Sequence, residues 1–332
     1  MLRAEADFLT VQRRLVEMYD TYSGAVVRVK ASFEEEAEDG TRSASLRVGS
    51  GFFISRDGHI LTNASVAHQA DRVWFEFRGG SYMAEIVGDD PETNVSLLRA
   101  VKLPEDFQTV SLTALNREPA VGTIVVGITQ PLDLEPGPVF GLLSGKDGQF
   151  AQRIFPTYYH RVSIPAYPGE GGSPVFSLDG RLLGMIVASL PEIRSSYLLP
   201  VEAMIRVRDE ILEEGKVVYS WIGVDLEEFS TVEEGSRVRV TEVVEDGPGD
   251  RMGLRKGDVL KELGGFATHT LGDVRQALFF YSAGSFLEVR WARNGEVLEK
   301  TLQTVARPKL DGEEEESASE PATPEVAETP GD

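Results

Sequence analysis

Hydrophobic positions along the first 22 residues recur three or four apart, which is the spacing of one face of an α-helix. The pattern therefore predicts an amphipathic N-terminal helix. Its apolar stripe can pack on the same chain or contact another subunit, and both interpretations fit the pattern. The stripe consists of Phe8, Val11, Leu15, Met18, Tyr19 and Tyr22.

From Ala25 onward the pattern changes to short apolar runs separated by turns that contain glycine, such as Asp57-Gly58. Many short strands with two-residue glycine turns predict an all-β sandwich or barrel, not an alternation of strands and helices. Closing such sheets into barrels removes exposed strand edges. Strands are predicted at residues 26–29, 51–54, 73–77, 82–87, 96–100, 123–128, 139–144, 161–164, 173–176 and 182–188.

A helix and then a second unit follow these strands. Pro200 begins and Gly215 ends a predicted helix over Val201–Glu214, with proline and glycine at their usual ends. The second unit is predicted to contain strands at 222–224, 238–243 and 259–263, a helix near Gly272–Tyr281, and a hairpin turned by Asn294-Gly295. That turn is the strongest short-range hairpin signal in the chain.

The predicted organisation is a helix over residues 1–22, a β domain over 23–215, a second domain over 217–306 and an acidic tail over 307–332. The tail consists largely of Glu, Ser, Ala, Pro and Thr. It is predicted to be disordered, because it cannot bury enough apolar surface to offset its chain entropy. For the same reason we expect the acidic stretch Glu34–Asp39 to be an exposed loop.

Charge and composition exclude several functions. The 54 acidic residues outnumber the 33 basic residues, which gives a net charge of −21. Such a surface repels nucleic acid and anionic membranes, so neither is expected as a partner. The chain has no cysteine, which excludes disulfides and thiolate chemistry. Its 4 histidines lack metal-ligand spacing, so we predict no metal site and no cofactor.

The longest apolar runs are too short to cross a bilayer, so no membrane span is predicted. The first 20 residues lack the apolar run and the cleavage site of a signal peptide. The compartment stays open between two expectations. A complete chain would be cytoplasmic, whereas a chain that has lost an export signal would belong to the periplasm or cell envelope.

Three segments of the β domain resemble the catalytic motifs of the HtrA (Deg) serine proteases. They are GSGFFISRDGHILTNASVAHQADRV, IVGDDPETNVSLLRA and PGEGGSPVFSLDGRLLGM, in the order and at separations like those of that family. Two further segments, VVYSWIGVDL and GDRMGLRKGDVLKELGG, are similar to the PDZ domain that follows the protease there. The resemblance implies a mainly β chain, with two six-stranded antiparallel β-barrels of the trypsin type followed by an α+β PDZ domain.

The catalytic residues of that family are not present at the matching positions. Ser65 stands where the histidine is expected, Asn94 where the aspartate is expected, and Gly171 where the nucleophilic serine is expected. A serine hydroxyl attacks only if a base takes its proton, and the base needs an acceptor that fixes its tautomer. Glycine offers no nucleophilic atom, and serine is no base near neutral pH. The sequence therefore predicts an inactive homologue.

Neighbouring residues offer an alternative. His68 and Ser173 lie close in sequence to the lost histidine and serine, so a relocated catalytic pair would make the chain an active serine endopeptidase. We expect instead a packing histidine and a serine at a strand start, since a helix after Asn63 would displace His68 by roughly 4.5 Å. Glu170 is expected to be a solvated loop carboxylate and not a general base for water.

The PDZ-like segment keeps the features of a peptide site. PDZ domains add an extended C-terminal peptide beside a β-strand and capture its carboxylate with backbone N–H groups. The resemblance places the carboxylate loop at Trp221, Ile222, Gly223 and Val224. Val274 and Leu278, one turn apart on the predicted helix, are candidates for the apolar wall of the groove, or they fill the domain core.

The function expected from these observations is that of a non-catalytic HtrA-like protein that binds peptides, unfolded polypeptides or protein C-termini. It would act as an adaptor or chaperone-like protein, or as a regulatory subunit, in protein quality control. The resemblance implies oligomers, either a homotrimer or a hetero-oligomer with an active HtrA paralogue. Besides the active endopeptidase, a purely structural scaffold with an empty PDZ groove is the second alternative.

Overall fold

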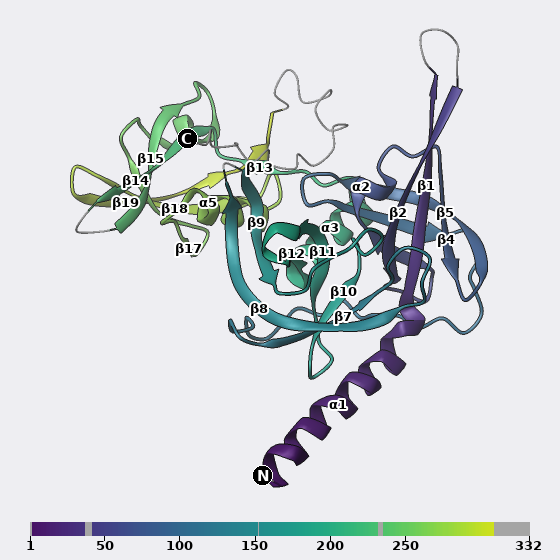
Figure 1. Ribbon diagram of the computed structural model, residues 1–332. Helices are drawn as coiled ribbons and strands as arrows, with labels where there is room; N and C mark the ends of the chain where they lie inside the picture. The colour runs from purple at the N-terminus through teal and green to yellow at the C-terminus, as the bar shows by residue number, and fades with distance from the viewer. Residues whose placement is uncertain (1, 37–41, 152, 232–234, 309–332) are drawn as a thin grey trace, which may run out of the picture.

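A computed structural model describes residues 2–36, 42–151, 153–231 and 235–308 (Figure 1). The chain is mainly β, with two closed six-stranded barrels followed by a smaller sheet that packs on a helix. The expectation of a double β-barrel followed by an α+β unit is therefore confirmed. The predicted acidic tail falls almost wholly on residues 309–332, which lie outside the described residues.

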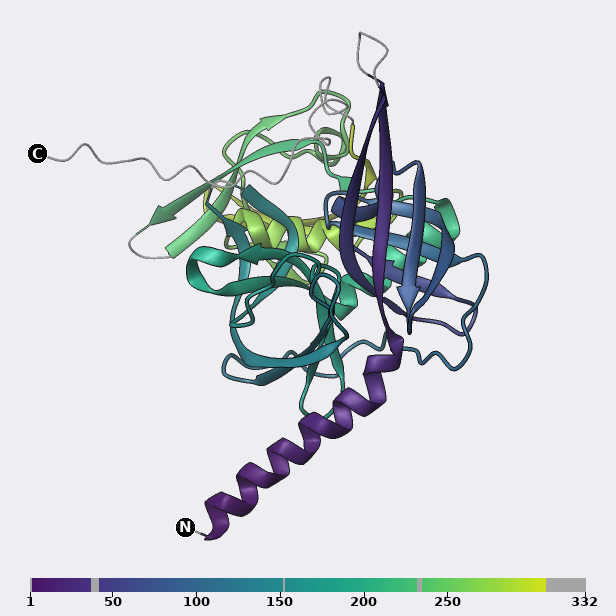
Figure 2. The same cartoon turned by 45° about the vertical axis from the view of Figure 1, so that its right-hand side comes forward.

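The N-terminal helix is present as α1 (Leu2–Tyr22). Its last turns pack on the body of the same chain, where Met18 is buried and the ring of Tyr22 stacks on Phe176 with 4.2 Å between centroids. The Tyr22 hydroxyl also donates a hydrogen bond to the Gly180 carbonyl at 2.7 Å. The earlier turns extend away from both barrels (Figures 1 and 2). The side chain of Phe8 lies outside the described residues.

The first barrel closes in the order β1-β2-β3-β6-β5-β4. Its interior is built around Phe53, which packs edge-on against Phe75, and Leu98 is fully buried in the same cluster. The acidic residues Glu34, Glu35 and Glu36 extend β1 (Val26–Glu36) instead of starting a loop, so that expectation was wrong for them, and residues 37–39 lie outside the described residues. Its strands are β1 (Val26–Glu36), β2 (Arg42–Phe53), β3 (His59–Thr62), β4 (Arg72–Phe77), β5 (Gly80–Asp90) and β6 (Val95–Ala100).

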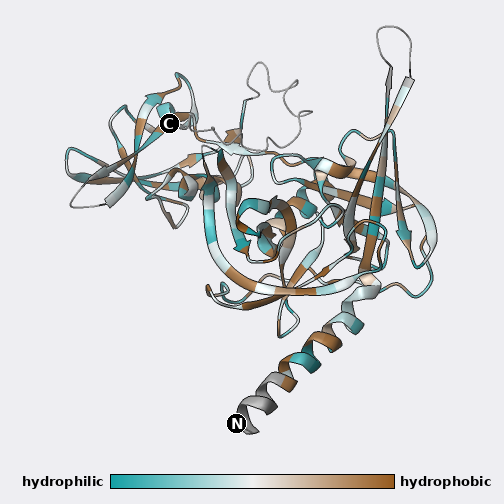
Figure 3. Cartoon of the chain, in the orientation of Figure 1, coloured by the Kyte–Doolittle hydropathy of each residue, from teal (hydrophilic) through white to brown (hydrophobic). Residues whose placement is uncertain are grey.

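The second barrel closes in the order β10-β11-β12-β9-β8-β7. Strand pairing within each barrel is antiparallel, and the hydrophobic residues of both barrels are visible along their strands in Figure 3. Its strands are β7 (Ile124–Thr129), β8 (Gly137–Phe150), β9 (Arg153–Val162), β10 (Pro174–Ser177), β11 (Leu182–Leu190) and β12 (Ser195–Pro200).

Short helices complete this part of the chain. The helix α3 (Val201–Glu214) has the predicted bounds and ends at Gly215, whose φ of 74° is left-handed. A single turn, α2 (Ala64–Ala67), follows Asn63 between β3 and β4. Two 3-10 turns, η1 (Ser23–Ala25) and η2 (Pro191–Ile193), precede β1 and β12.

The C-terminal unit is a sheet in the order β14-β15-β16-β18-β19, so β14 is an edge strand. The hairpin at Asn294-Gly295 joins its last two strands, as predicted, and both turn residues have positive φ, 51° and 83°. The strands are β13 (Ser220–Trp221), β14 (Val224–Thr231), β15 (Gly235–Val243), β16 (Val259–Leu263), β17 (Phe266–Ala267), β18 (Phe286–Arg293), β19 (Glu296–Gln303) and β20 (Val305–Ala306), and the helices are α4 (Pro248–Met252) and α5 (Leu271–Phe279).

The C-terminal unit contacts the second barrel through α5, which packs beside β9 (Figure 1). The hydroxyl of Tyr158 on β9 donates a hydrogen bond to Asp273 of α5 at 2.9 Å. A second link joins the connecting segment to the first barrel, where the Tyr219 hydroxyl donates to Asp90 at 2.8 Å. None of the described helices is both long enough and apolar enough to span a membrane.

Candidate functional site

The loop that precedes β10 places Gly171 between the two barrels. The amide of Ser50 on β2 donates a hydrogen bond to the Gly171 carbonyl at 2.8 Å, which ties the loop to the first barrel. A Cβ atom added to Gly171 would lie only 2.8 Å from Nδ2 of Asn63. The Asn63 amide therefore fills the space beside the residue that stands at the nucleophile position. No sequence motif pointed to this contact.

Asn94 forms hydrogen bonds with backbone groups on two sides. Its Oδ1 accepts a hydrogen bond from the Ser65 amide at 2.7 Å, and its Nδ2 donates to the Val187 carbonyl at 2.8 Å. The residue has a left-handed φ of 60°, a conformation that asparagine tolerates better than most residues. We call Asn94 with these two partners the Asn94 clamp. The clamp joins α2 to β11, and the side chain of Ser65 itself is exposed.

His68 follows α2 and pairs with a carboxylate of the first barrel. Its Nδ1 lies 3.2 Å from Oδ2 of Asp89, whose other oxygen accepts a hydrogen bond from the hydroxyl of Ser96. The His68 side chain is 25% exposed. This arrangement resembles a base with its orienting acceptor, but it involves Asp89 and not Asn94.

Ser173 does not meet His68. Its side chain is fully buried at the start of β10, and its hydroxyl has no hydrogen-bond partner among the described residues. A nucleophile must contact both its base and the substrate. The structure therefore does not bring these two residues of the alternative catalytic pair together.

Glu170 is not the solvated carboxylate that the sequence predicted. It is only 3% exposed, and its two oxygens accept hydrogen bonds from the Thr129 hydroxyl and the Tyr167 amide, both at 2.7 Å. The expectation was wrong because one partner, Thr129, is 41 residues away in sequence and belongs to β7. Glu170 thus holds the loop before Gly171 against the second barrel.

A buried carboxylate, Asp90, lies at the end of β5 near this site. Burial raises its pKa, against hydrogen bonds from Thr93 and Tyr219 that favour the charged form. Because Tyr219 belongs to the segment that leads into the C-terminal unit, Asp90 connects that segment to the loop carrying Asn94. The sequence motifs did not single out Asp90.

The carboxylate loop expected at residues 221–224 lies where β13 leads into β14. Gly223 has a positive φ of 75°, and a Cβ atom there would lie 2.9 Å from Cδ of Pro248. Its carbonyl accepts a hydrogen bond from the Val244 amide at 3.0 Å, and the Ile222 carbonyl accepts one from Gly249 at 2.8 Å. Glycine is therefore required here by both conformation and space.

The remaining residues expected at the groove lie around this loop. Trp221 is half-buried in β13, while Ile222 and Val224 are buried. On α5, Val274 is only 3% exposed and packs in the domain core, whereas Leu278 is half-buried. The Leu278 carbonyl accepts a hydrogen bond from the Ser220 hydroxyl at 2.8 Å, so the end of α5 lies beside the loop.

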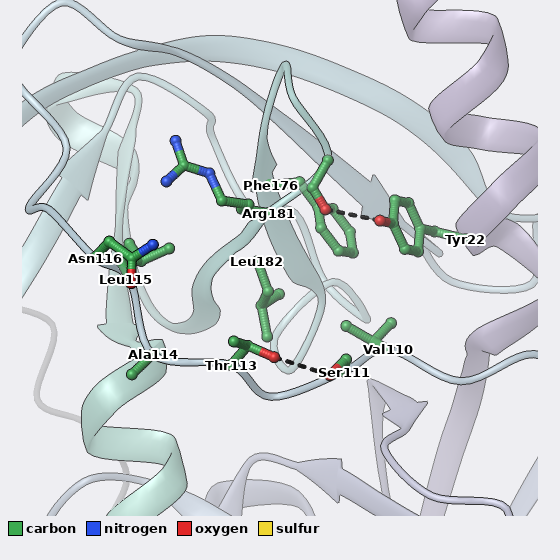
Figure 4. A pocket seen from close by; sticks show the side chains of 11 residues that line it. Tyr22, Val110, Ser111, Thr113, Ala114, Leu115, Asn116, Phe176, Arg181 and Leu182 are labelled. Carbon is green, nitrogen blue, oxygen red and sulfur yellow. Dashed lines mark hydrogen bonds between the residues drawn. The ribbon is translucent and has the colours of Figure 1, made fainter.

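A cavity of about 300 Å³ lies elsewhere, between the end of α1, the segment that joins the barrels, and the β10–β11 turn (Figure 4). It is lined in part by Tyr22, Thr113, Phe176 and Leu182. None of the predicted site residues lines it. Among the described residues, no group of three or more His, Cys, Asp or Glu side chains is arranged to hold a metal ion.

Comparison with known domains agrees with this architecture. Residues 49–185 match the trypsin-like peptidase domain, and residues 220–304 match the PDZ domain. A DegP-like protein of Halomonas elongata, described as a probable periplasmic serine endoprotease, is 28% identical over 261 residues, or 75% of this chain and 54% of that protein. A protein of the same description from Pseudomonas fulva is 29% identical over 85% of this chain and 61% of its own length.

Solved structures show the same fold. The HtrA-type protease AlgW with a tripeptide superposes with a TM-score of 0.72 at 22% identity, covering 90% of this chain and 99% of that one. A serine endoprotease from Yersinia pestis gives a TM-score of 0.62 at 21% identity, over 89% of this chain and 98% of that one. This chain therefore joins a trypsin-like peptidase domain to a PDZ domain. Across 90% of its length, the chain has the fold of an HtrA-type protease structure.

Proposed function

We propose that this protein is a non-catalytic HtrA-type protein that binds protein C-termini or unfolded polypeptides through its PDZ domain. It acts as an adaptor or chaperone-like protein, or as a regulatory subunit of an active paralogue, in protein quality control. The observation that carries the first half of this proposal is the Asn94 clamp. Both polar atoms of the Asn94 side chain bond to backbone groups, and Ser65 beside it offers no imidazole for the side chain to orient.

Gly171 and Asn63 support the same interpretation. Gly171 supplies no nucleophilic atom, and the Asn63 amide occupies the adjacent space. A serine triad that loses its nucleophile and its base together loses turnover by about a millionfold in subtilisin. The peptidase domain then contributes a rigid body and a surface for assembly.

The PDZ domain supports the binding function. An extended peptide adds to a sheet at an unpaired edge, and β14 is such an edge, bordered by α5. The loop where a C-terminal carboxylate would be captured contains the buried residues Ile222 and Val224, and the half-buried Leu278 of α5 lies beside it. The chain spans 54% and 61% of the two curated relatives above, so its partners and assembly are part of the proposal.

Binding is tested with the whole chain and a fluorescent octapeptide that ends in valine, in matched free-acid and amidated forms. We expect the free acid to bind and the amide to bind at least tenfold more weakly, because the loop recognises the carboxylate. Gly223→Val should abolish binding, with Gly235→Val in the neighbouring β-hairpin as the control. Failure of both peptides to bind would leave the structural scaffold as the function.

An active endopeptidase is the second candidate, because His68 and Asp89 are paired and the relatives are described as serine endoproteases. Cleavage of casein over hours is followed beside labelling with a fluorophosphonate probe. We expect neither. Cleavage and labelling that both disappear in Ser173→Ala would show that the chain is an active protease, since the reaction would then depend on that hydroxyl.

A further inference from the structure

The direction of α5 relative to β14 fixes how a bound peptide would meet the helix. The carbonyl of Leu278, near the end of α5, bonds to Ser220 beside the carboxylate loop. The amide of Leu271, at the start of α5, donates to Glu228 in the far half of β14 at 3.2 Å. The helix and the strand are therefore antiparallel. A peptide with its last residue at the loop would pass Leu278 first and Leu271 last.

The spacing along the two elements places one peptide position beside Arg275. A helix rises about 1.5 Å per residue, so Arg275 lies roughly 4.5 Å and Leu271 roughly 10.5 Å from the level of Leu278. Side chains on the same face of an extended peptide are two residues apart, about 6.7 Å. The third residue from the C-terminus therefore falls between Arg275 and Leu271, and nearer to Arg275.

Arg275 presents an available positive charge at this level. It shares one helix face with Leu271 and Leu278, which are four residues before it and three after it. Its side chain is exposed, and it forms no ion pair with a described residue. Two acidic side chains of α5 and β14, Asp273 and Glu228, already accept hydrogen bonds from other groups. Asp273 accepts hydrogen bonds from Tyr158 and Thr270, and Glu228 accepts them from Ser236 and Leu271.

We infer that the PDZ groove selects C-termini that carry an acidic side chain at the third position from the end. The inference rests on the proposed function, because it names the peptides which that site prefers. We expect the last residue to be apolar, since the loop carries the apolar residues Ile222 and Val224 and the end of α5 brings Leu278 beside it. Asp225 is exposed on β14. Successive side chains of an extended peptide point to opposite sides. We expect Asp225 to lie beside the peptide side chains that point away from α5, and not beside the acidic side chain at the third position.

The test uses octapeptides ending Xaa-Ala-Val, in which Xaa is Glu, Gln or Lys, and fluorescence anisotropy with the full chain at low ionic strength. We expect the Glu peptide to bind about fivefold more tightly than the Lys peptide, which is the scale of an exposed ion pair combined with the loss of a repulsion. The preference should shrink at high salt, because exposed charges are screened.

Charge reversal identifies the residue responsible. Arg275→Glu should invert the order, so that the Lys peptide binds more tightly, whereas Arg255→Glu, an exposed site in the same domain, should leave the order unchanged. Three equal affinities in the parent protein, or an order that Arg275→Glu does not alter, would overturn the inference while leaving C-terminal binding intact. Absence of binding by all three peptides and by other free C-termini would instead contradict the proposed function.

Discussion

At the scale of single residues, Asn94 and the neighbour of Gly171 at the triad-like positions make structural contacts. Asn94 bonds to two backbone groups, and Glu170, next to Gly171, is buried with both oxygens bonded. The Asn94 bonds join α2 to β11, and the Glu170 bonds hold the loop before β10 against β7. Asn94 and Glu170 therefore contribute to the structure of the peptidase domain.

Asn94→Asp is expected to destabilise the protein by about 1–3 kcal/mol at neutral pH. A carboxylate cannot donate to the Val187 carbonyl, so a buried acceptor loses its partner and faces a negative charge. Urea unfolding measures the change, with the exposed Asn116→Asp as the control. The loss should diminish at acid pH, where a protonated carboxyl can donate again. Equal stability of Asn94→Asp and the parent would show that the clamp contributes little.

At the scale of elements, the strand β9 carries two side chains with different structural roles. Tyr158 reaches α5 of the PDZ domain, while His160 is 4% exposed inside the peptidase domain. Burial lowers the pKa of His160 to about 4, because the charged imidazole loses its hydration there. The strand that joins the two domains therefore contains a group that the fold keeps neutral.

This burial predicts a pH-dependent stability. The unfolded chain takes up a proton on His160 near pH 6.5, whereas the folded chain does so only near pH 4. Stability is thus fully present above pH 6.5 and decreases as the pH falls toward 4, by up to about 3 kcal/mol. His160→Gln should flatten the difference between unfolding free energies at pH 7 and pH 5. If the unfolding free energies of the parent and of His160→Gln changed equally between pH 7 and pH 5, His160 would not be the cause of the pH dependence.

The sequence predicted the elements whose signals are local. The helix over Val201–Glu214 has its proline and glycine at either end, and the Asn294-Gly295 turn needs only its own two residues. It could not predict the burial of Glu170 or the two bonds of Asn94. Those depend on Thr129 and Val187, which reach the site only after both barrels have closed. The three triad-like positions were found through motif similarity, but their present contacts were not.

At the scale of the whole molecule, the domains are linked by contacts on two sides. Tyr158 contacts the start of α5, whereas Tyr219 and Arg307 attach the beginning and end of the PDZ domain to Asp90 and Glu92 of the first barrel. Domains within one chain usually move relative to each other unless their interface is extensive. These contacts favour a joint unfolding.

Calorimetry should accordingly show one unfolding transition for the full chain. Tyr158→Phe removes the hydrogen bond to Asp273 and is expected to lower the free energy of unfolding by about 0.5–1.5 kcal/mol. The PDZ domain should then unfold at a lower temperature than the peptidase domain. The matched control is Tyr167→Phe, since Tyr167 is 63% exposed. Two separate transitions in the parent protein would contradict the joint unfolding.

The free edge of β14 also bears on the solubility of the protein. An unpaired strand edge is a template on which other copies of the same chain can add, and proteins often protect such edges with charge. Asp225 and Glu228 lie along β14, whereas Glu227 on the same strand pairs with Arg239 of β15. Two copies joined edge to edge would bring these carboxylates together. The strand that we propose as the peptide site would thus repel a second copy of itself, which would keep the site available at high protein concentration.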